Sequence, residues 1–132
     1  MKLITKDTDY AIRALMYLGR NIDKFIPSSE ISSSERIPKH FLRTILQKLI
    51  KAGILVSREG SSGGVMLNKK SEEVCIIDVI NIFQGRVQVS DCMFRNKVCP
   101  ERAKCVIKSK IAAIESRLIK EFESITIHAL NN

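Results

Sequence analysis

The sequence predicts a mainly α-helical protein with one small β-hairpin, arranged as a winged helix-turn-helix followed by a long C-terminal helix. Three observations predict this fold class. Helical patterns cover residues 8–20 and 38–53, two short β-prone runs flank a Gly/Ser-rich connection within 54–67, and an apolar seam follows residue 101. A chain of 132 residues with 45% hydrophobic side chains is long enough for one domain, so residues 1–132 are taken as a single unit.

The N-terminal third predicts two helices. The first covers residues 8–20, with Thr8 or Asp9 as its cap. Its side chains available for burial are Ile12, Leu15, Met16 and Leu18. A loop around Pro27 follows, and a short helix is expected to begin near Ser28 or Ser29.

The next segment, "PKHFLRTILQKLIKAG", predicts a third helix of about four turns. Pro38 suits its first turn and Gly53 suits its end. The residues expected on its apolar face are Phe41, Leu42, Ile45, Leu49 and Ile50. After this helix the spacing of the apolar residues changes. We expect a β-hairpin, the wing, near residues 54–67, with its two strands at Ile54–Ser57 and Val65–Leu67.

The C-terminal half predicts two further helices around a cysteine-containing loop. One helix is expected over residues 72–84, after Ser71, with Cys75 as a small core residue. A loop spans residues 86–106, and a helix spans 101–127. Its apolar side chains recur every three or four residues, at Ile107, Ile111, Ile114, Leu118, Phe122 and Ile125. This seam is long for so small a domain and predicts a dimerisation helix and a homodimer.

Positive charge is concentrated in the first half of the chain. Residues 1–70 contain 13 Lys/Arg and 6 Asp/Glu, a balance of +7, whereas residues 71–132 contain 9 and 8, a balance of +1. Between Arg36 and Arg58 there is no acidic residue. An unopposed basic segment is typical of a polyanion-binding surface. Together with the helix-turn-helix and hairpin order, it predicts that residues 1–70 form the part that binds double-stranded DNA.

The expected DNA contacts lie on the third helix and in the wing. A recognition helix presents donors to base edges and phosphates from the face opposite its apolar one. The candidates on the helix are Lys39, His40, Arg43, Thr44, Gln47, Lys48 and Lys51, and those in the wing are Arg58, Ser61, Ser62, Gly63 and Gly64. His40 is equally compatible with DNA contact, a metal ligand or neither.

Other classes of protein fit the sequence poorly. The chain contains no apolar run of the roughly 18 residues that a membrane span needs, so we expect a cytoplasmic protein without a membrane partner. His40 and His128 are the only histidines, and neither a nucleotide-binding glycine motif nor a catalytic triad is present. The sequence therefore predicts neither an enzyme nor a small-molecule substrate.

Three of the four cysteines lie close together. Cys92, Cys99 and Cys105 have the spacing C-x6-C-x5-C. A cytosolic cysteine group is more often metal-binding or redox-active than disulfide-bonded. Structural zinc sites favour closer cysteine pairs, whereas iron–sulfur clusters take thiolate ligands from loops of varied length. The spacing by itself leaves an iron–sulfur cluster, zinc and reactive thiols open.

Nearly the whole chain resembles a known family. The similarity rests on the opening "MKLITKDTDYAIRALMYL", on "IPKHFLRTILQKLIKAGILVSREGSSGGVML", on "CIIDVINIFQG", on the three cysteines and on "ESITIHAL". These segments resemble the winged-helix repressors that include IscR, NsrR and RirA, the Rrf-two family. The family's wing usually reads RGxxGG, whereas this chain has "SREGSSGG", with Glu59 in the usual arginine position.

The resemblance implies that Cys92, Cys99 and Cys105 hold an iron–sulfur cluster, although the first cysteine gap here is six residues and the family's is usually five. IscR-like members take a histidine three residues after the last cysteine, where this chain has Lys108. NsrR-like members take an aspartate of the partner subunit's first helix, with an arginine one turn later.

The NsrR-like pattern matches Asp9 and Arg13 and favours a 4Fe-4S over a 2Fe-2S cluster. Asp7 is an alternative ligand, and a helix cap is an alternative role for Asp9.

These observations predict a homodimeric transcriptional regulator, with a repressor favoured. Its operator affinity would respond to nitric oxide, redox state or iron availability through the cluster. The alternative is a winged-helix regulator whose thiols or a zinc ion sense directly, without a cluster.

Overall fold

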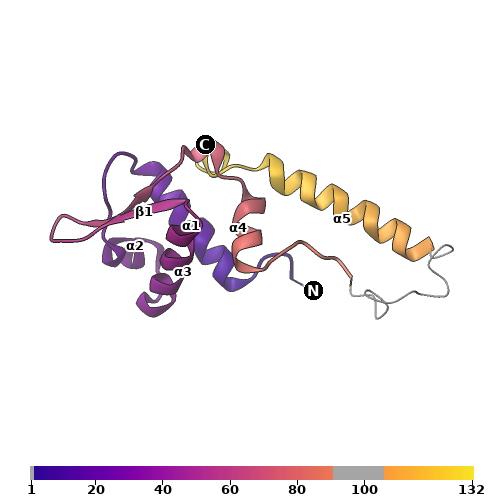
Figure 1. The fold of residues 1–132 in the computed structure, drawn as a ribbon, viewed down its shortest axis with the longest axis horizontal. Helices are drawn as coiled ribbons and strands as arrows, with labels where there is room; N and C mark the ends of the chain where they lie inside the picture. Colours follow the sequence, from indigo (N-terminus) through magenta and orange to yellow (C-terminus); the bar gives the residue numbers. More distant parts are fainter. Residues whose placement is uncertain (1, 91–105) are drawn as a thin grey trace.

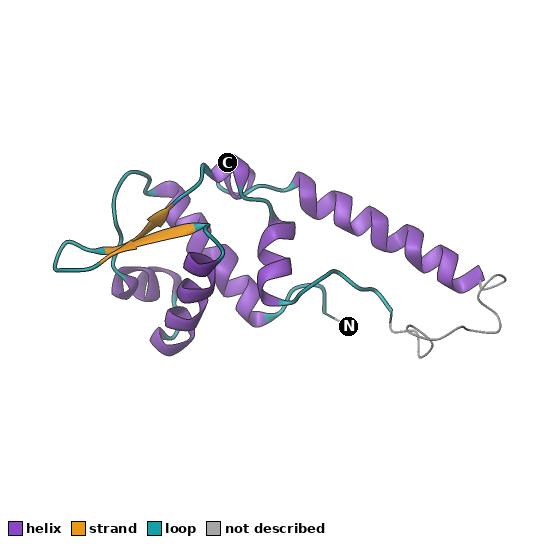
Figure 2. Ribbon diagram, viewed as in Figure 1, coloured by secondary structure: helices purple, strands orange, loops and turns teal. Residues whose placement is uncertain are grey.

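The computed structural model describes residues 2–90 and 106–132. Helices α1 (Lys6–Arg20), α2 (Ser28–Glu35) and α3 (Lys39–Lys51) precede strands β1 (Leu55–Arg58) and β2 (Gly64–Leu67). The turn η1 (Ser71–Glu73) and helices α4 (Ile76–Phe83), α5 (Val106–Ser124) and α6 (Ile127–Leu130) complete the fold. The predicted class is confirmed, because the chain is mostly helical with one two-stranded antiparallel hairpin (Figures 1 and 2).

Helix α1 begins earlier than the sequence predicted. Thr5 is its N-cap, and the Thr5 side chain accepts a hydrogen bond from the Thr8 backbone N–H. The predicted caps, Thr8 and Asp9, were therefore wrong, since both lie inside the helix. Several threonines and aspartates crowd this terminus, and local preference does not choose among them. The buried residues of the helix include Leu15 and Leu18, as predicted.

Helices α2 and α3 meet in the turn of the helix-turn-helix. Arg36 ends α2 in the left-handed conformation, with φ 54°, and the Ser32 hydroxyl donates to the Ile37 carbonyl at 2.6 Å. Pro38, predicted in the first turn of α3, is instead its N-cap, and Gly53, with φ 82°, follows the end of the helix, as predicted. The buried side chains of α3 are Leu42, Ile45, Leu46 and Leu49. Leu46 was missed, and Phe41, predicted on the apolar face, is exposed.

The hairpin pairs Leu55 with Leu67 and Arg58 with Gly64. It is fixed to the rest of the domain by two hydrogen bonds between Ile26 and Val65, of 2.8 and 2.9 Å. Gly64 has φ 149°, and a Cβ there would lie 2.2 Å from the Ile26 carbonyl oxygen. Only glycine therefore allows the wing to approach the α1–α2 connection this closely.

The helix predicted over residues 72–84 is interrupted. A short turn, η1, precedes an extended step, and α4 begins only at Ile76. The interruption is caused by pairing with a segment far along the chain. The Ile76 N–H donates to the Ile125 carbonyl, and the Ile127 N–H donates to the Val74 carbonyl. Cys75 is consequently the half-buried N-cap of α4 and not a core residue.

The same contact ends the long C-terminal helix at Ser124, three residues before its predicted end, and Thr126 caps α6. The predicted start at residue 101 lies outside the described residues. Helix α5 projects away from α1–α3 and the hairpin, with α4 between them (Figure 1). Its described residues include none that is fully buried, and the side chain of Ile107 is 75% exposed and that of Ile114 is 44% exposed.

None of the described helices is both long enough and apolar enough to cross a membrane.

Candidate nucleic-acid interface and metal ligands

Helix α3 presents a basic face to solvent. Its apolar side chains anchor it in the core, which leaves the opposite side free. The predicted contact residues of this face are all exposed: Lys39, His40, Arg43, Thr44, Gln47, Lys48 and Lys51. Within residues 2–90 and 106–132, none of the α3 lysines or arginines forms an ion pair. Their charge is therefore not neutralised by the acidic side chains that the structure describes.

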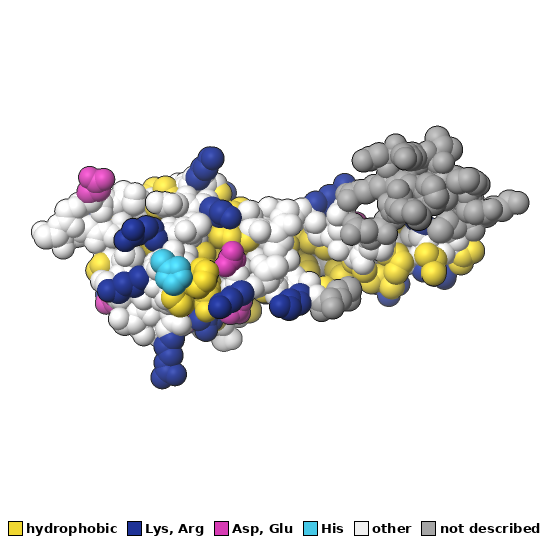
Figure 3. Space-filling view, turned by 90° about the horizontal axis from the view of Figure 1, so that it is seen from below, with side chains coloured by type: hydrophobic (Ala, Val, Ile, Leu, Met, Phe, Trp, Pro, Cys, Tyr) yellow, Lys and Arg dark blue, Asp and Glu magenta, His cyan; other side chains and the backbone are white. Residues whose placement is uncertain are grey.

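One acidic side chain of the helix-turn-helix, that of Glu35, is already paired. Glu35, at the end of α2, accepts a hydrogen bond from Arg20 of α1 at 3.0 Å. Figure 3 shows one face of the molecule on which lysine and arginine side chains, with some Asp or Glu side chains among them, surround a histidine and a group of hydrophobic side chains. Such a surface attracts a phosphate backbone and offers donors to bases.

Arg58 lies in the wing and is held there by two contacts. Its guanidinium carbon is 4.3 Å from the centroid of the Phe25 ring, and its Nη2 donates to the Ser62 carbonyl at 3.0 Å. Ser61 and Ser62 are exposed, whereas Gly63 and Gly64 are half-buried. The two glycines thus shape the hairpin, because a Cβ on Gly63 would lie 2.0 Å from the Arg58 carbonyl oxygen.

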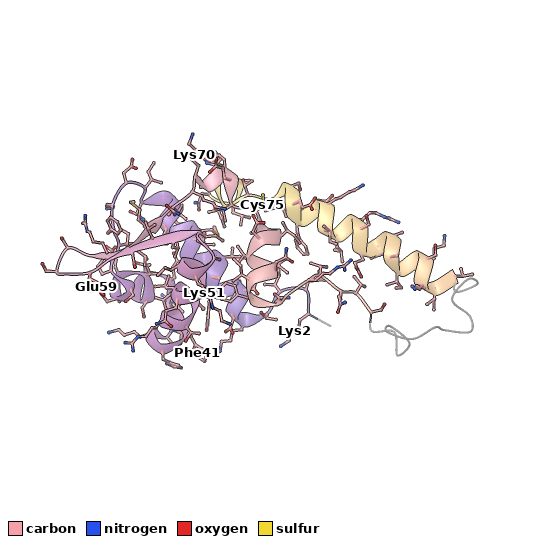
Figure 4. All side chains as sticks on the ribbon, in the orientation of Figure 1. Lys2, Phe41, Lys51, Glu59, Lys70 and Cys75 are labelled. Carbon is pink, nitrogen blue, oxygen red and sulfur yellow. The ribbon has the colours of Figure 1, made fainter. Side chains whose placement is uncertain are left out.

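The sequence reasoning missed residues that border this face. Phe25 supports Arg58, and Lys6 and Tyr10 of α1 lie beside Phe41. The sequence did contain a signal for the position of Phe41, because this residue directly precedes Leu42 at the edge of the apolar stripe of α3. Figure 4 places Phe41 and Lys51 at opposite ends of α3 and Glu59 at the tip of the wing.

Asp9 and Arg13 lie one turn apart on α1 and form a loose ion pair, with 3.7 Å between Asp9 Oδ2 and Arg13 Nε. The Asp9 side chain is 58% exposed. Arg13 Nη2 donates to the Glu35 carbonyl at 3.0 Å, which joins α1 to the end of α2. Arg13 Nε is buried and has no hydrogen-bond partner among the described residues. The Asp9 carboxylate is therefore accessible from solvent, as a metal ligand supplied to another subunit must be.

Cys92, Cys99 and Cys105 lie outside the described residues, and the structure does not test their predicted role. The flanking segment Arg86–Ser90 runs along α5, and the Val89 N–H donates to Glu115 Oε2 at 3.3 Å. A groove of about 640 Å³ separates the two and is lined by Lys108 among others. In the described parts of the chain, no group of three or more His, Cys, Asp or Glu side chains could hold a metal ion.

The fourth cysteine, Cys75, is separate from these ligands. Burial raises the pKa of its thiol, and the negative charges of Asp78 and Glu123 raise it further. The backbone N–H of Cys75 also donates to Asp78 Oδ2 at 3.1 Å. A thiol of raised pKa is a poor nucleophile and a poor metal ligand at neutral pH, which fits a structural cysteine.

Comparison with known proteins gives consistent results. The family model described as "Rrf2: Iron-dependent Transcriptional regulator" matches residues 4–132. A protein of Aquifex aeolicus named as an HTH-type transcriptional regulator is 32% identical over 133 residues, covering 98% of this chain and 92% of that protein.

Several solved structures share the fold, CymR and IscR among them. The global cysteine regulator CymR of B. subtilis has a TM-score of 0.80 at 18% identity, covering 99% of this chain and 97% of that chain. IscR of T. potens has a TM-score of 0.77 at 18% identity, and the match covers 98% of this chain and 85% of that chain.

Proposed function

The chain belongs to the Rrf2 family of transcriptional regulators, and we propose that it is a cytoplasmic, homodimeric repressor whose affinity for its operator is set by an iron–sulfur cluster. The family and the named relative are transcriptional regulators and not enzymes, which confirms that prediction. The observation that carries the proposal is the exposed face of α3, whose basic side chains have no acidic partner among the described residues.

Helix α3 would enter the major groove. Arg43, Thr44 and Gln47 would read base edges, since their side chains are on its exposed face. Lys39, His40 and Lys48 of the same face suit phosphate contacts, and Arg58, Ser61 and Ser62 of the wing suit the adjacent backbone or minor groove. No small-molecule substrate is part of this activity.

Two protomers would pair through α5. The exposed hydrophobic side chains of this helix include Val106, Ile107 and Ile114, and nothing in the described chain covers them. A second copy of the same helix is a suitable cover, because an isologous pair buries both seams at once. Ile114→Glu should therefore give a monomer by analytical ultracentrifugation. Ser116→Glu, about 200° around the helix, should stay dimeric.

Cys92, Cys99 and Cys105 of one protomer and Asp9 of the partner subunit would hold the cluster, a 4Fe-4S cluster in preference to 2Fe-2S. The described residues fit this role at Asp9, which is exposed and only loosely paired with Arg13. When bound, the group supplies a redox-active centre that is sensitive to nitric oxide and to iron supply. Arg13 would orient the Asp9 carboxylate, and its bond to the Glu35 carbonyl joins that site to the helix-turn-helix.

Two measurements test the proposal. Selection from a pool of random duplexes should yield an operator with two half-sites, and Arg43→Ala should weaken its binding by about 1–3 kcal/mol and relax specificity at one base pair. Anaerobically purified protein should contain iron and sulfide and absorb visible light. A colourless preparation without iron or sulfide would favour direct sensing by thiols or zinc, and failure to select any duplex would contradict DNA binding.

A further inference from the structure

An aromatic group is exposed where α3 begins. The Phe41 side chain is 37% exposed, and its ring lies 4.2 Å from the His40 ring and 6.3 Å from the Tyr10 ring, between centroids. Lys6 Nζ is 5.2 Å from the Phe41 centroid and 5.6 Å from the Tyr10 centroid. Between Asp23 and Ser90, Phe41 is the one large hydrophobic side chain that is exposed.

The position of Phe41 on α3 connects it to the DNA-reading face. Residues three and seven positions later share its side of the helix, and these are Thr44 and Lys48, both exposed. On its other flank, Ile45 lies one turn later and is buried in the core, as are Leu42 and Leu49. Phe41 therefore borders the polar face instead of completing the core. Figure 4 shows its side chain at the outer end of the domain, at the start of α3.

We propose that Phe41 is a specificity-determining residue that contacts the 5-methyl group of a thymine in the major groove, an inference that rests on the proposed DNA-binding function. The first residues of a recognition helix meet base edges. The thymine methyl is the apolar group that the major groove offers, and a phenylalanine side chain suits it. Lys6, beside the Phe41 ring, and Lys48, on the same side of α3, provide the charge complementarity that brings DNA to this surface.

Tyr10 and Lys6 act as positioning residues for this contact. The Tyr10 ring lies beside the Phe41 ring, and Arg13 lies over the Tyr10 ring with its guanidinium carbon 5.1 Å from the centroid. These contacts from α1 restrict the rotamers of Phe41 before DNA arrives. A side chain already fixed in its bound position loses less entropy on binding.

Uracil scanning tests the proposal. In the selected operator, each thymine is replaced in turn by uracil, which removes only the methyl group, and affinity is measured by fluorescence anisotropy. At one symmetric pair of positions, the uracil substitution should weaken binding about fourfold per half-site. This is the effect expected from losing one buried methyl group. If none of the uracil substitutions changes the affinity of the wild-type protein for the operator, the proposal is overturned.

Variants assign the effect to Phe41. Phe41→Ala should bind the thymine and uracil operators equally, whereas Ile22→Ala, an exposed apolar side chain far from α3 in sequence, should keep the fourfold preference. Phe41→Leu retains an apolar side chain, so it should keep part of the preference if the alanine variant does not fold. Full preference in either Phe41 variant would overturn the proposal. Absence of any duplex binding by the wild-type protein would instead contradict the proposed function.

Discussion

The guanidinium of Arg58 lies over the ring of Phe25, with 4.3 Å between the guanidinium carbon and the ring centroid. Phe25 belongs to the α1–α2 connection and Arg58 to the wing, so the contact joins two segments that meet at the hairpin. Together with the Ser62 carbonyl, the ring holds the one cation of the wing in a defined position. Arg58 stands one position before the usual arginine of the family's wing, and in this chain Phe25 and the Ser62 carbonyl hold it in place.

Phe25→Leu should weaken operator binding about two- to fivefold, because it removes a cation–π contact worth about 0.5–1 kcal/mol at an exposed site. The measurement is fluorescence anisotropy with the selected operator. In an Arg58→Ala background, the same substitution should have no further effect. Additive losses in the double variant would show that Phe25 does not act through Arg58.

Glu59→Gln should raise DNA affinity about two- to fivefold in about 50 mM salt, since an exposed carboxylate at the wing tip repels phosphates by up to about 1 kcal/mol. The gain should shrink as salt screens the repulsion. Glu121→Gln on α5 removes the same charge far from the wing and serves as the control. Equal gains in both variants would mean that the wing does not lie close to DNA.

Ile127→Ala should destabilise the protein by about 2–5 kcal/mol, because this side chain is fully buried where α6 packs against α1 and η1. Urea unfolding followed by circular dichroism measures the change. Leu130→Ala, in the same short helix but exposed, should change stability by less than about 0.5 kcal/mol. Similar losses in the two variants would contradict the packing of the C-terminus described above.

Cys75 should react slowly with iodoacetamide, since burial and the carboxylates of Asp78 and Glu123 raise the pKa of its thiol. A variant with Cys92, Cys99 and Cys105 replaced by serine leaves Cys75 as the sole thiol, and mass spectrometry follows its alkylation from pH 7 to 10. Glu123→Gln should speed the reaction by removing one of the charges. Reaction as fast as that of an unstructured cysteine peptide would contradict the raised pKa.

The same pKa shift links Cys75 to stability. The folded chain favours the neutral thiol, so this contribution is fully present below the pKa of the unfolded chain and is lost as the pH rises through the folded-state pKa. The stability of the single-cysteine variant should therefore fall at alkaline pH more than that of its Cys75→Ser counterpart.

Local signals in the sequence predicted much of the DNA-binding part. Pro38, Gly53 and the apolar repeat between them predicted α3, and the change of period after Gly53 predicted the hairpin. These features depend on backbone preferences and burial patterns within a few residues. The exposed basic face of α3 followed from the same pattern.

What the sequence missed depends on contacts between distant segments. Periodicity continues through Ile125, yet the helix ends at Ser124 because Thr126 pairs with Cys75. Phe41 is exposed because the core is filled by its neighbours, and its contact with Tyr10 depends on how α1 packs against α3. The predicted role of Asp9 came from a family resemblance, and the structure contributes its exposure and its pairing with Arg13.

The measurement that tests the central claim most directly compares operator affinity of the anaerobically purified protein before and after removal of the proposed cluster. The account predicts a difference of about 5- to 150-fold, the range of a coupling free energy of 1–3 kcal/mol. The variant with serine at Cys92, Cys99 and Cys105 should match the cluster-free protein. Equal affinity of the cluster-bound and cluster-free forms would contradict the account.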